Sequence, residues 1–168
     1  MSHFAVEISG IAGEETLSDY EGTITCRSFK HGIDLPVVAK GSDRTDGASI
    51  HGSIVLEHEI DAATPALREA CAKSSNIDDV TITRTKMIGG EVQAADITKL
   101  KNAKVVNVYV DTPMDPASGK PADMPMEFFV LDYEEIKWEH KVYVNGVASD
   151  TLAGSYDTTT MSTTVSIA

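Results

Sequence analysis

Histidine and carboxylate residues gather in the segment 51–59, where they could bind a metal ion. His58 stands between Glu57 and Glu59, and His51 lies earlier in the segment. The same segment alternates apolar and polar residues with the period of two that is typical of a β-strand. Successive side chains of a strand point to opposite faces, so Glu57 and Glu59 point away from the face of His58. We therefore expect no metal site and interpret the histidines as half-buried structural residues.

Two further patterns imitate sites without completing them. Gly47, Ala48 and Ser49 begin a nucleophile elbow, but His51 stands where the final glycine belongs. The turn 43–47 resembles a calcium-binding loop, yet Ser53 occupies the position of the bidentate glutamate. Neither pattern indicates a site.

Glu134 and Glu135 could be imagined as an acid and base pair. Adjacent residues of a strand face opposite ways, so these two carboxylates could not flank one scissile bond. The sequence also has no phosphate-binding GxxxxGK[ST] run and no GxGxxG. We expect no catalytic residue, no cofactor and no metal, and a protein that is not an enzyme.

The composition indicates one compact domain spanning residues 1–168, with 42% hydrophobic residues and a formal net charge of -12. Such an acidic chain would be repelled by nucleic acid and by anionic membranes. The two cysteines, Cys26 and Cys71, are too few for a disulfide scaffold. No apolar run approaches the roughly 20 residues that span a bilayer, and residues 1–10 alternate instead of forming a signal peptide. We expect a protein made in the cytoplasm that does not insert into membranes.

Alternation of apolar and polar residues dominates the chain and predicts antiparallel strands, for example at residues 3–9, 53–60 and 80–83. One segment differs, because Thr64 and Pro65 are typical of a helix start and are followed by Leu67 and Ala70 at helical spacing. The predicted fold class is mostly β, an antiparallel β-barrel or sandwich with one short lateral α-helix at about residues 64–74.

Two predicted strands, 104–110 and 126–133, are apolar on both faces. Either another part of the chain or a neighbouring subunit covers the second face, and two such strands favour an oligomer. The apolar positions change parity after Tyr133, which predicts a bulge or bend near Glu134. The structural core that we predict consists of Leu56, Ile60, Leu67, Phe129, Leu131, Tyr133, Ile136 and Trp138.

Three segments are predicted to be irregular. Residues 36–49 are polar and rich in turn formers, and four prolines interrupt residues 112–125. Asn145 and Gly146 form a tight-turn dipeptide. The Ser/Thr-rich tail from about residue 147 is expected either to fold back as an edge strand through residues 161–167 or to be mobile.

The order of these features resembles the Hcp family, the haemolysin-coregulated proteins that build the inner tube of type VI secretion systems. The resemblance covers roughly residues 4–145, and its strength lies in the order and spacing of its motifs. The residues that carry it are Phe29, His31, Gly32, Ile33 and Pro36, the run 51–61, Thr64, Pro65, Leu67 and Ala70, the run 83–91, and the run 131–138.

The resemblance implies a β-barrel subunit that associates six to a ring, and rings that stack into a hollow tube. Its partners would be other copies of itself, the spike protein and sheath of the apparatus, and effector proteins in the lumen. It implies secretion through the apparatus without a signal peptide. The loop that would reach the next ring holds Pro36, Lys40, Asp43, Arg44, Asp46 and Ile50.

Two alternatives stay open at this point. The first is a phage-type or extracellular contractile-injection tail tube protein, which would share the same fold. The second is a monomeric ligand-binding β-barrel, suggested by the proximity in sequence of Tyr133, Trp138 and Tyr143.

Overall fold

The computed structural model describes residues 3–40, 43–112, 114, 117–119 and 125–168, with the backbone alone described at 38–40 and 43–46. Strands predominate, and one helix, α1 (Thr64–Lys73), is present in this part of the chain. The strands are β1 (Phe4–Ile8), β2 (Ile24–Lys30), β3 (Ile33–Asp34), β4 (Val37–Lys40), β5 (Asp43–Asp46), β6 (Ile50–His51), β7 (Ile54–Glu59), β8 (Ile77–Ile88), β9 (Glu91–Asp111), β10 (Met126–Asp132), β11 (Glu135–Val144) and β12 (Val147–Asp157).

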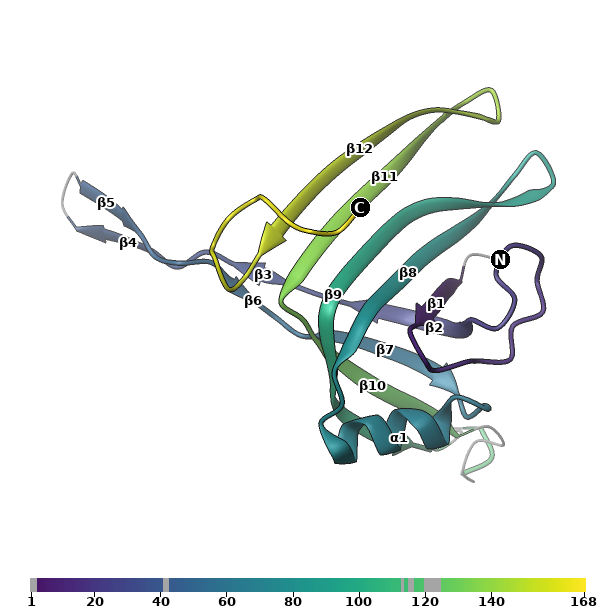
Figure 1. Ribbon diagram of the computed structural model, residues 1–168. Coiled ribbons are helices and arrows are strands. Elements are labelled where there is room, and N and C mark those ends of the chain that lie inside the picture. The colour runs from purple at the N-terminus through teal and green to yellow at the C-terminus, as the bar shows by residue number, and fades with distance from the viewer. Residues whose placement is uncertain (1–2, 41–42, 113, 115–116, 120–124) are drawn as a thin grey trace.

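Six antiparallel strands close into a barrel in the order β10, β7, β2, β1, β8 and β9, and β9 pairs back with β10. The long strand β9 makes this closure possible, since its two halves have different partners. Its first half pairs with β11 at residues 96–101, and its second half pairs with β10 at residues 104–111. The hairpins β8–β9 and β11–β12 therefore extend beyond the barrel (Figure 1). The predicted mostly-β barrel with one helix is confirmed.

The alternation of β7 is visible in its burial, because Ile54, Leu56 and His58 are buried and the residues between them are only half-buried. The strand ends at Glu59, where the chain turns toward the helix. Ile60 is consequently 44% exposed, and its prediction as a core residue is wrong. A parity argument holds only as far as the strand itself extends.

The helix α1 has the bounds predicted from the sequence to within one residue. Leu67 and Ala70 face the core, and Ser74 ends the helix in a left-handed conformation with φ of 53°. Thr64 is the first residue of the helix and not its N-cap, because the cap position is Ala63 in a helical conformation. The Thr64 hydroxyl instead accepts a hydrogen bond from the Asp61 amide at 3.3 Å.

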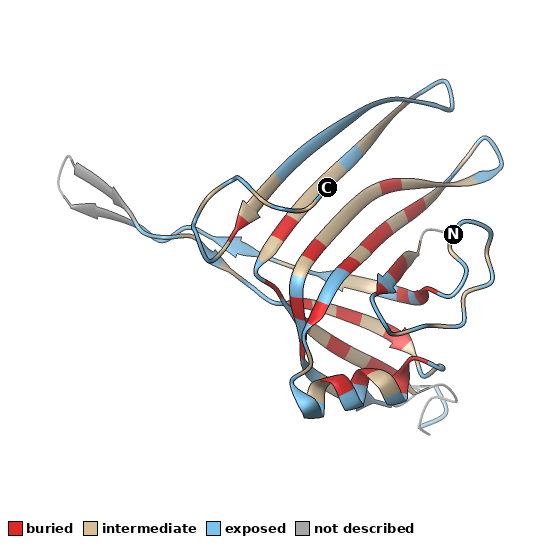
Figure 2. Cartoon of the chain, viewed as in Figure 1, coloured by how far each residue is buried: buried red, intermediate tan, exposed pale blue. Residues whose placement is uncertain are grey.

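The core is continuous from the barrel strands to α1 (Figure 2). Of the other predicted core residues, Leu56, Leu67, Phe129, Leu131, Tyr133 and Ile136 are buried, and Trp138 is half-buried at its edge. The chain breaks its strand between Asp132 and Glu135. This is the predicted bend, and it lets Ile136 point inward on the opposite parity from Leu131.

Residues 31–40 and 43–53 form an arm that projects from the barrel (Figure 1). The expectation of an irregular loop at 36–49 is wrong, because β4 pairs with β5 and β3 pairs with β6. Strand pairing satisfies the backbone hydrogen-bonding groups that an irregular polar segment would leave to water. Of the prolines in the second predicted irregular segment, Pro113, Pro116 and Pro121 lie outside the described residues, and Pro125 directly precedes β10.

The C-terminal region also differs from its prediction. Asn145 and Gly146 form a turn, with φ values of 51° and 81°, and the chain returns along β11 as β12. Both residues have the positive φ that a two-residue hairpin turn requires, so pairing resumes at Val147. Residues 161–167 form no strand, and the edge strand is 147–157 instead. No helix in the described part of the chain has the length and apolarity needed to cross a bilayer.

Candidate assembly surfaces

The outer face of β9 and β10 carries apolar side chains that the described part of the chain leaves exposed. Tyr109 and Phe128 are cross-strand partners, and their rings stack with centroids 4.9 Å apart and planes within 4° of parallel. Tyr109 is 44% exposed, and Val106 of the same strand is exposed as well. The helix leaves this face open, since its buried residues belong to the core cluster. Large aromatic and β-branched side chains in such an exposed patch are typical of an interaction surface.

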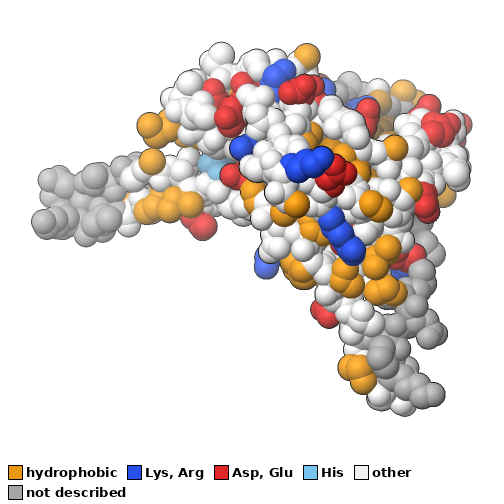
Figure 3. Space-filling view, turned by 60° about the horizontal axis from the view of Figure 1, so that its bottom comes forward, with side chains coloured by type: hydrophobic (Ala, Val, Ile, Leu, Met, Phe, Trp, Pro, Cys, Tyr) orange, Lys and Arg blue, Asp and Glu red, His pale blue; other side chains and the backbone are white. Residues whose placement is uncertain are grey.

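The arm is a second uncovered apolar surface. Ile33, Leu35 and Ile50 are all exposed near its root, and hydrophobic side chains are visible there in the space-filling view (Figure 3). Among the predicted loop residues, Pro36 and Ile50 are exposed. The others, Lys40, Asp43, Arg44 and Asp46, have backbones in the β4–β5 ladder, and their side chains lie outside the described part of the chain.

Two histidines fix the root of the arm to the barrel. His31 lies just beyond β2 and His51 lies in β6. The hydroxyl of Tyr133, at the bend between β10 and β11, is 2.7 Å from His31 Nε2 and 3.0 Å from His51 Nδ1. Burial lowers the pKa of both histidines, and His51 lowers the pKa of His31 further. Burial, and then the charge of Asp132, raises the pKa of Tyr133.

Aromatic rings extend this contact to the outer hairpin. The His51 ring stacks on Tyr156 of β12 with centroids 4.7 Å apart, and it also lies against Trp138 of β11. Trp138 is therefore a packing residue at the arm root. Tyr143 lies elsewhere, where its hydroxyl donates to the Ala94 carbonyl oxygen at 2.7 Å. The three rings suggested for ligand binding do not come together.

A buried carboxylate joins the helix to the barrel. Glu127 of β10 is fully buried, and its Oε2 accepts hydrogen bonds from Arg68 Nε at 2.9 Å and Nη2 at 2.7 Å. Its Oε1 lies 3.2 Å from Nε2 of His58. His58 is thus a structural histidine with a carboxylate partner. The sequence contained a signal for this contact, because Glu127 has the inward parity of Phe129 and Leu131 and a buried charge needs a partner.

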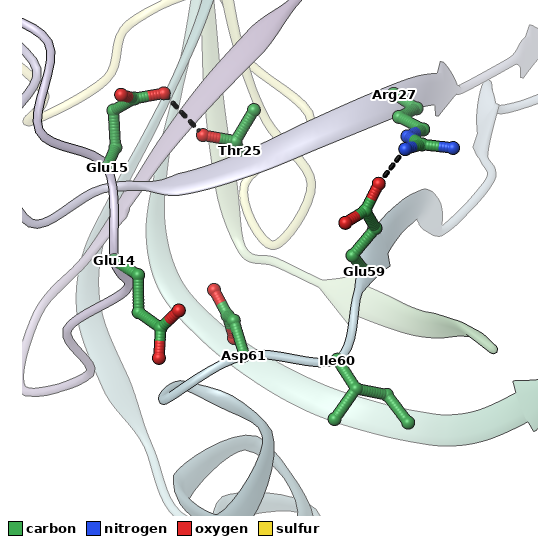
Figure 4. Close-up of a pocket in the computed structure, with 7 residues that line it drawn as sticks. All are labelled: Glu14, Glu15, Thr25, Arg27, Glu59, Ile60 and Asp61. Carbon is green, nitrogen blue, oxygen red and sulfur yellow. Dashed lines mark hydrogen bonds and ion pairs between the residues drawn. The ribbon is translucent and has the colours of Figure 1, made fainter. Parts of the chain in front are cut away.

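An acidic pocket of about 330 Å³ opens between the 9–23 loop, β2 and the start of α1 (Figure 4). Its carboxylates hold backbone amides and side chains in place. Glu14 accepts a hydrogen bond from the Ala62 amide at 3.1 Å, Asp61 accepts one from the Ala63 amide at 2.9 Å, and Glu59 pairs with Arg27. Burial raises the pKa of Asp61. These contacts fix the loop to the helix start and account for the acidic lining without a ligand.

The carboxylates considered for catalysis have separate structural partners. Glu134 accepts a hydrogen bond from Asn102 Nδ2 at 2.7 Å, and Glu135 accepts one from the Ser166 amide at 2.7 Å. Within the described residues, no group of three or more His, Cys, Asp and Glu side chains is placed to hold a metal ion. The described side chains therefore make structural contacts and form exposed apolar faces.

Sequence comparison relates this architecture to a family. The family described as "Type VI secretion system effector, Hcp" matches residues 6–140, which is most of the chain. The chain belongs to the Hcp family. The resemblance inferred from the order of the sequence motifs is therefore confirmed, and Hcp proteins are structural tube proteins. A search of curated protein sequences finds no significant match.

Several solved structures share the Hcp fold over nearly their whole length. A structure described as a type six secretion system protein has a TM-score of 0.85 and 18% identity, covering 96% of this chain and 99% of that one. Hcp1 from Salmonella typhimurium has a TM-score of 0.74 and 20% identity, with coverages of 95% and 97%. Hcp1 from the E. coli EAEC 042 pathovar has a TM-score of 0.69 and 24% identity, with coverages of 94% and 97%.

Proposed function

We propose that this Hcp protein is a structural subunit of the type VI secretion inner tube, which closes into rings of six copies that stack into a hollow tube. The observation that carries the proposal is the exposed apolar face around Tyr109 and Phe128 in a chain that belongs to the Hcp family. One copy leaves this face in water, and a neighbouring copy would bury it. Burial of apolar area is the main favourable term in most protein association.

Ring closure requires two different complementary surfaces on each subunit. The stacked face of β9 and β10 supplies one of them. The second surface is the edge strand β12, whose outer backbone groups have no partner strand within the described sheet. An open edge is a template for pairing with another chain, and both surfaces are rigid parts of the same eight-stranded sheet.

The arm supplies the axial contact between rings in this proposal. Its exposed apolar residues, Ile33, Leu35 and Ile50, lie on a projection that stands clear of the barrel. The spike protein and the sheath would contact the finished tube, and the lumen would hold effector proteins. The subunit would be made in the cytoplasm and leave through the apparatus that it forms.

Native mass spectrometry of Tyr109 variants tests the proposal. Wild-type protein and Tyr109→Phe, which keeps the stacked ring, should give hexamers. Tyr109→Glu places a charge in the contact and should give monomers with an unchanged fold by circular dichroism. Hexamers of Tyr109→Glu would show that this face lies outside the ring contact, and a strictly monomeric wild type at all concentrations would contradict ring formation altogether.

A further inference from the structure

The direction of the arm is determined at its root. In the described part of the chain, the strands of the arm pair with each other and make no extensive contact with a barrel strand or the helix. The backbone enters and leaves the arm through Gly32 and Gly52, whose amide and carbonyl groups are joined by a 2.9 Å hydrogen bond. Both residues are exposed, so they offer no packing that would fix the arm. The attachment comes from the two histidine side chains.

The hydroxyl group of Tyr133 can satisfy both histidines only while at least one of them is neutral. A phenol has one proton to donate and lone pairs that accept. With neutral imidazoles, Tyr133 donates to one histidine nitrogen and accepts an N–H from the other, over the 2.7 and 3.0 Å contacts. When both imidazoles are protonated, both donate to the phenol, and the phenol proton has no acceptor between them. The two cations then also repel each other.

One described neighbour favours added charge on the cluster, because a backbone hydrogen bond with Gly52 acts to raise the pKa of His31, but burial and then His51 outweigh it. Phe29 of β2, Trp138 of β11 and Tyr156 of β12 contact the histidines through uncharged rings. The charge that acts on the cluster from the bend is Asp132, and it acts on Tyr133. The lowered pKa values of His31 and His51 agree with this geometry.

We propose that the His31–Tyr133–His51 cluster is an acid-sensitive latch, which holds the arm against β11 and β12 at neutral pH and releases it when both histidines have taken up protons. Released histidines are solvated and titrate near the ordinary value of about 6.5. The released state therefore binds more protons than the latched state, and acid favours release. The latch is complete above about pH 6.5 and weakens as the pH falls toward the lowered pKa values of the two latched histidines.

The latch has a consequence that rests on the proposed function. If arms join successive rings, mild acid would separate rings from one another. Ring closure and arm release have separate readouts, since ring closure is counted by mass and arm release is measured within one chain.

Hydrogen exchange at the Gly52 amide reports the latch, because this amide donates to the Gly32 carbonyl oxygen at the arm root and the Gly52 backbone also hydrogen-bonds with His31. After correction for intrinsic rates, its protection should fall between pH 7.5 and pH 5, by at most about tenfold per pH unit for each proton taken up. Protection in β8 should stay constant. The measurement needs no oligomer, so it stands even if ring formation fails.

Two variants isolate the cause. Replacing both histidines, His31→Gln with His51→Gln, keeps hydrogen-bonding groups that cannot titrate and should abolish the acid response. Tyr133→Phe removes the hydroxyl and should lower Gly52 protection already at pH 7.5. Equal wild-type protection at both pH values would overturn the latch. An acid response that persists in the double variant would also overturn the latch. This result does not depend on whether Tyr133→Phe folds.

Discussion

The barrel and the arm are built from the same kind of element and differ in what covers them. Each barrel strand has a partner on both sides, and most of its inward residues are buried around Phe129 and Leu131. The arm consists of two short ladders whose apolar residues remain exposed. The barrel therefore holds itself together, whereas the arm depends on its root and on partners. Stability resides in the first region, whereas in the proposed function the second region joins one ring to the next.

The largest effect is expected in the barrel. Phe129→Ala removes a fully buried ring and should lower the free energy of unfolding by about 3–5 kcal/mol. Chemical denaturation measures the change. Ile50→Ala, at an exposed arm position, is the matched control and should change stability by less than about 0.5 kcal/mol. Similar losses in both variants would erase the distinction between the two regions.

A smaller effect is expected at the junction of barrel and helix. Glu127→Ala leaves His58 without its buried partner and should lower the free energy of unfolding by about 2 kcal/mol. Arg68→Ala removes one partner of the buried carboxylate and leaves the Glu127 contact to His58 in place. It should therefore lower the free energy of unfolding by less than Glu127→Ala does. Thermal unfolding of the two variants ranks them. A larger loss for Arg68→Ala would mean that the ion pair, and not the histidine contact, secures the helix.

A local effect is expected where β12 ends. Hydrogen bonds from Thr159 and Thr160 lower the pKa of Asp157 to about 2. An unfolded aspartate titrates near about 3.9, so this stabilisation is complete above that value and is lost as the pH falls toward 2. NMR titration of Asp157 should show the lowered pKa. An ordinary value would mean that the turn after β12 is not held by this carboxylate.

The smallest effect concerns assembly. Copies of a chain with a net charge of -12 repel one another, and salt screens this repulsion. Raising the ionic strength from 0.05 to about 0.5 M should therefore increase the fraction of protein in rings without changing the unfolding midpoint of the barrel appreciably. Light scattering measures the ring fraction. Dissociation by salt would indicate that opposite charges meet across the contact.

The barrel was predictable because period-two burial is a local signal, as in Ile54, Leu56 and His58. The bend after Tyr133 was predictable from the change of parity. The strand pairing of the arm was not, since residues 36–49 are polar and rich in turn formers and their pairing follows from register, which composition does not reveal. Strand β12 was missed for a similar reason, because most of its residues are exposed and carry no alternation to detect.

The apolar outer face was predictable in part, since strands 104–110 and 126–133 are apolar on both sides. The sequence left open whether the same chain covers them, and the exposure of Tyr109 and Val106 shows that the described residues leave this outer face uncovered. The latch at the arm root was not predictable from local pattern. It joins His31 and His51 to Tyr133, which is distant from both in sequence, and only the folded barrel brings them together.

Electron microscopy of the purified protein, viewed end-on, is the most direct test of the claim that uncovered strand faces are satisfied by sister copies. The account predicts annular particles with six-fold symmetry for wild-type protein and Tyr109→Phe, and their absence for Tyr109→Glu. Single compact particles of the wild type, at every concentration and salt condition, would contradict it.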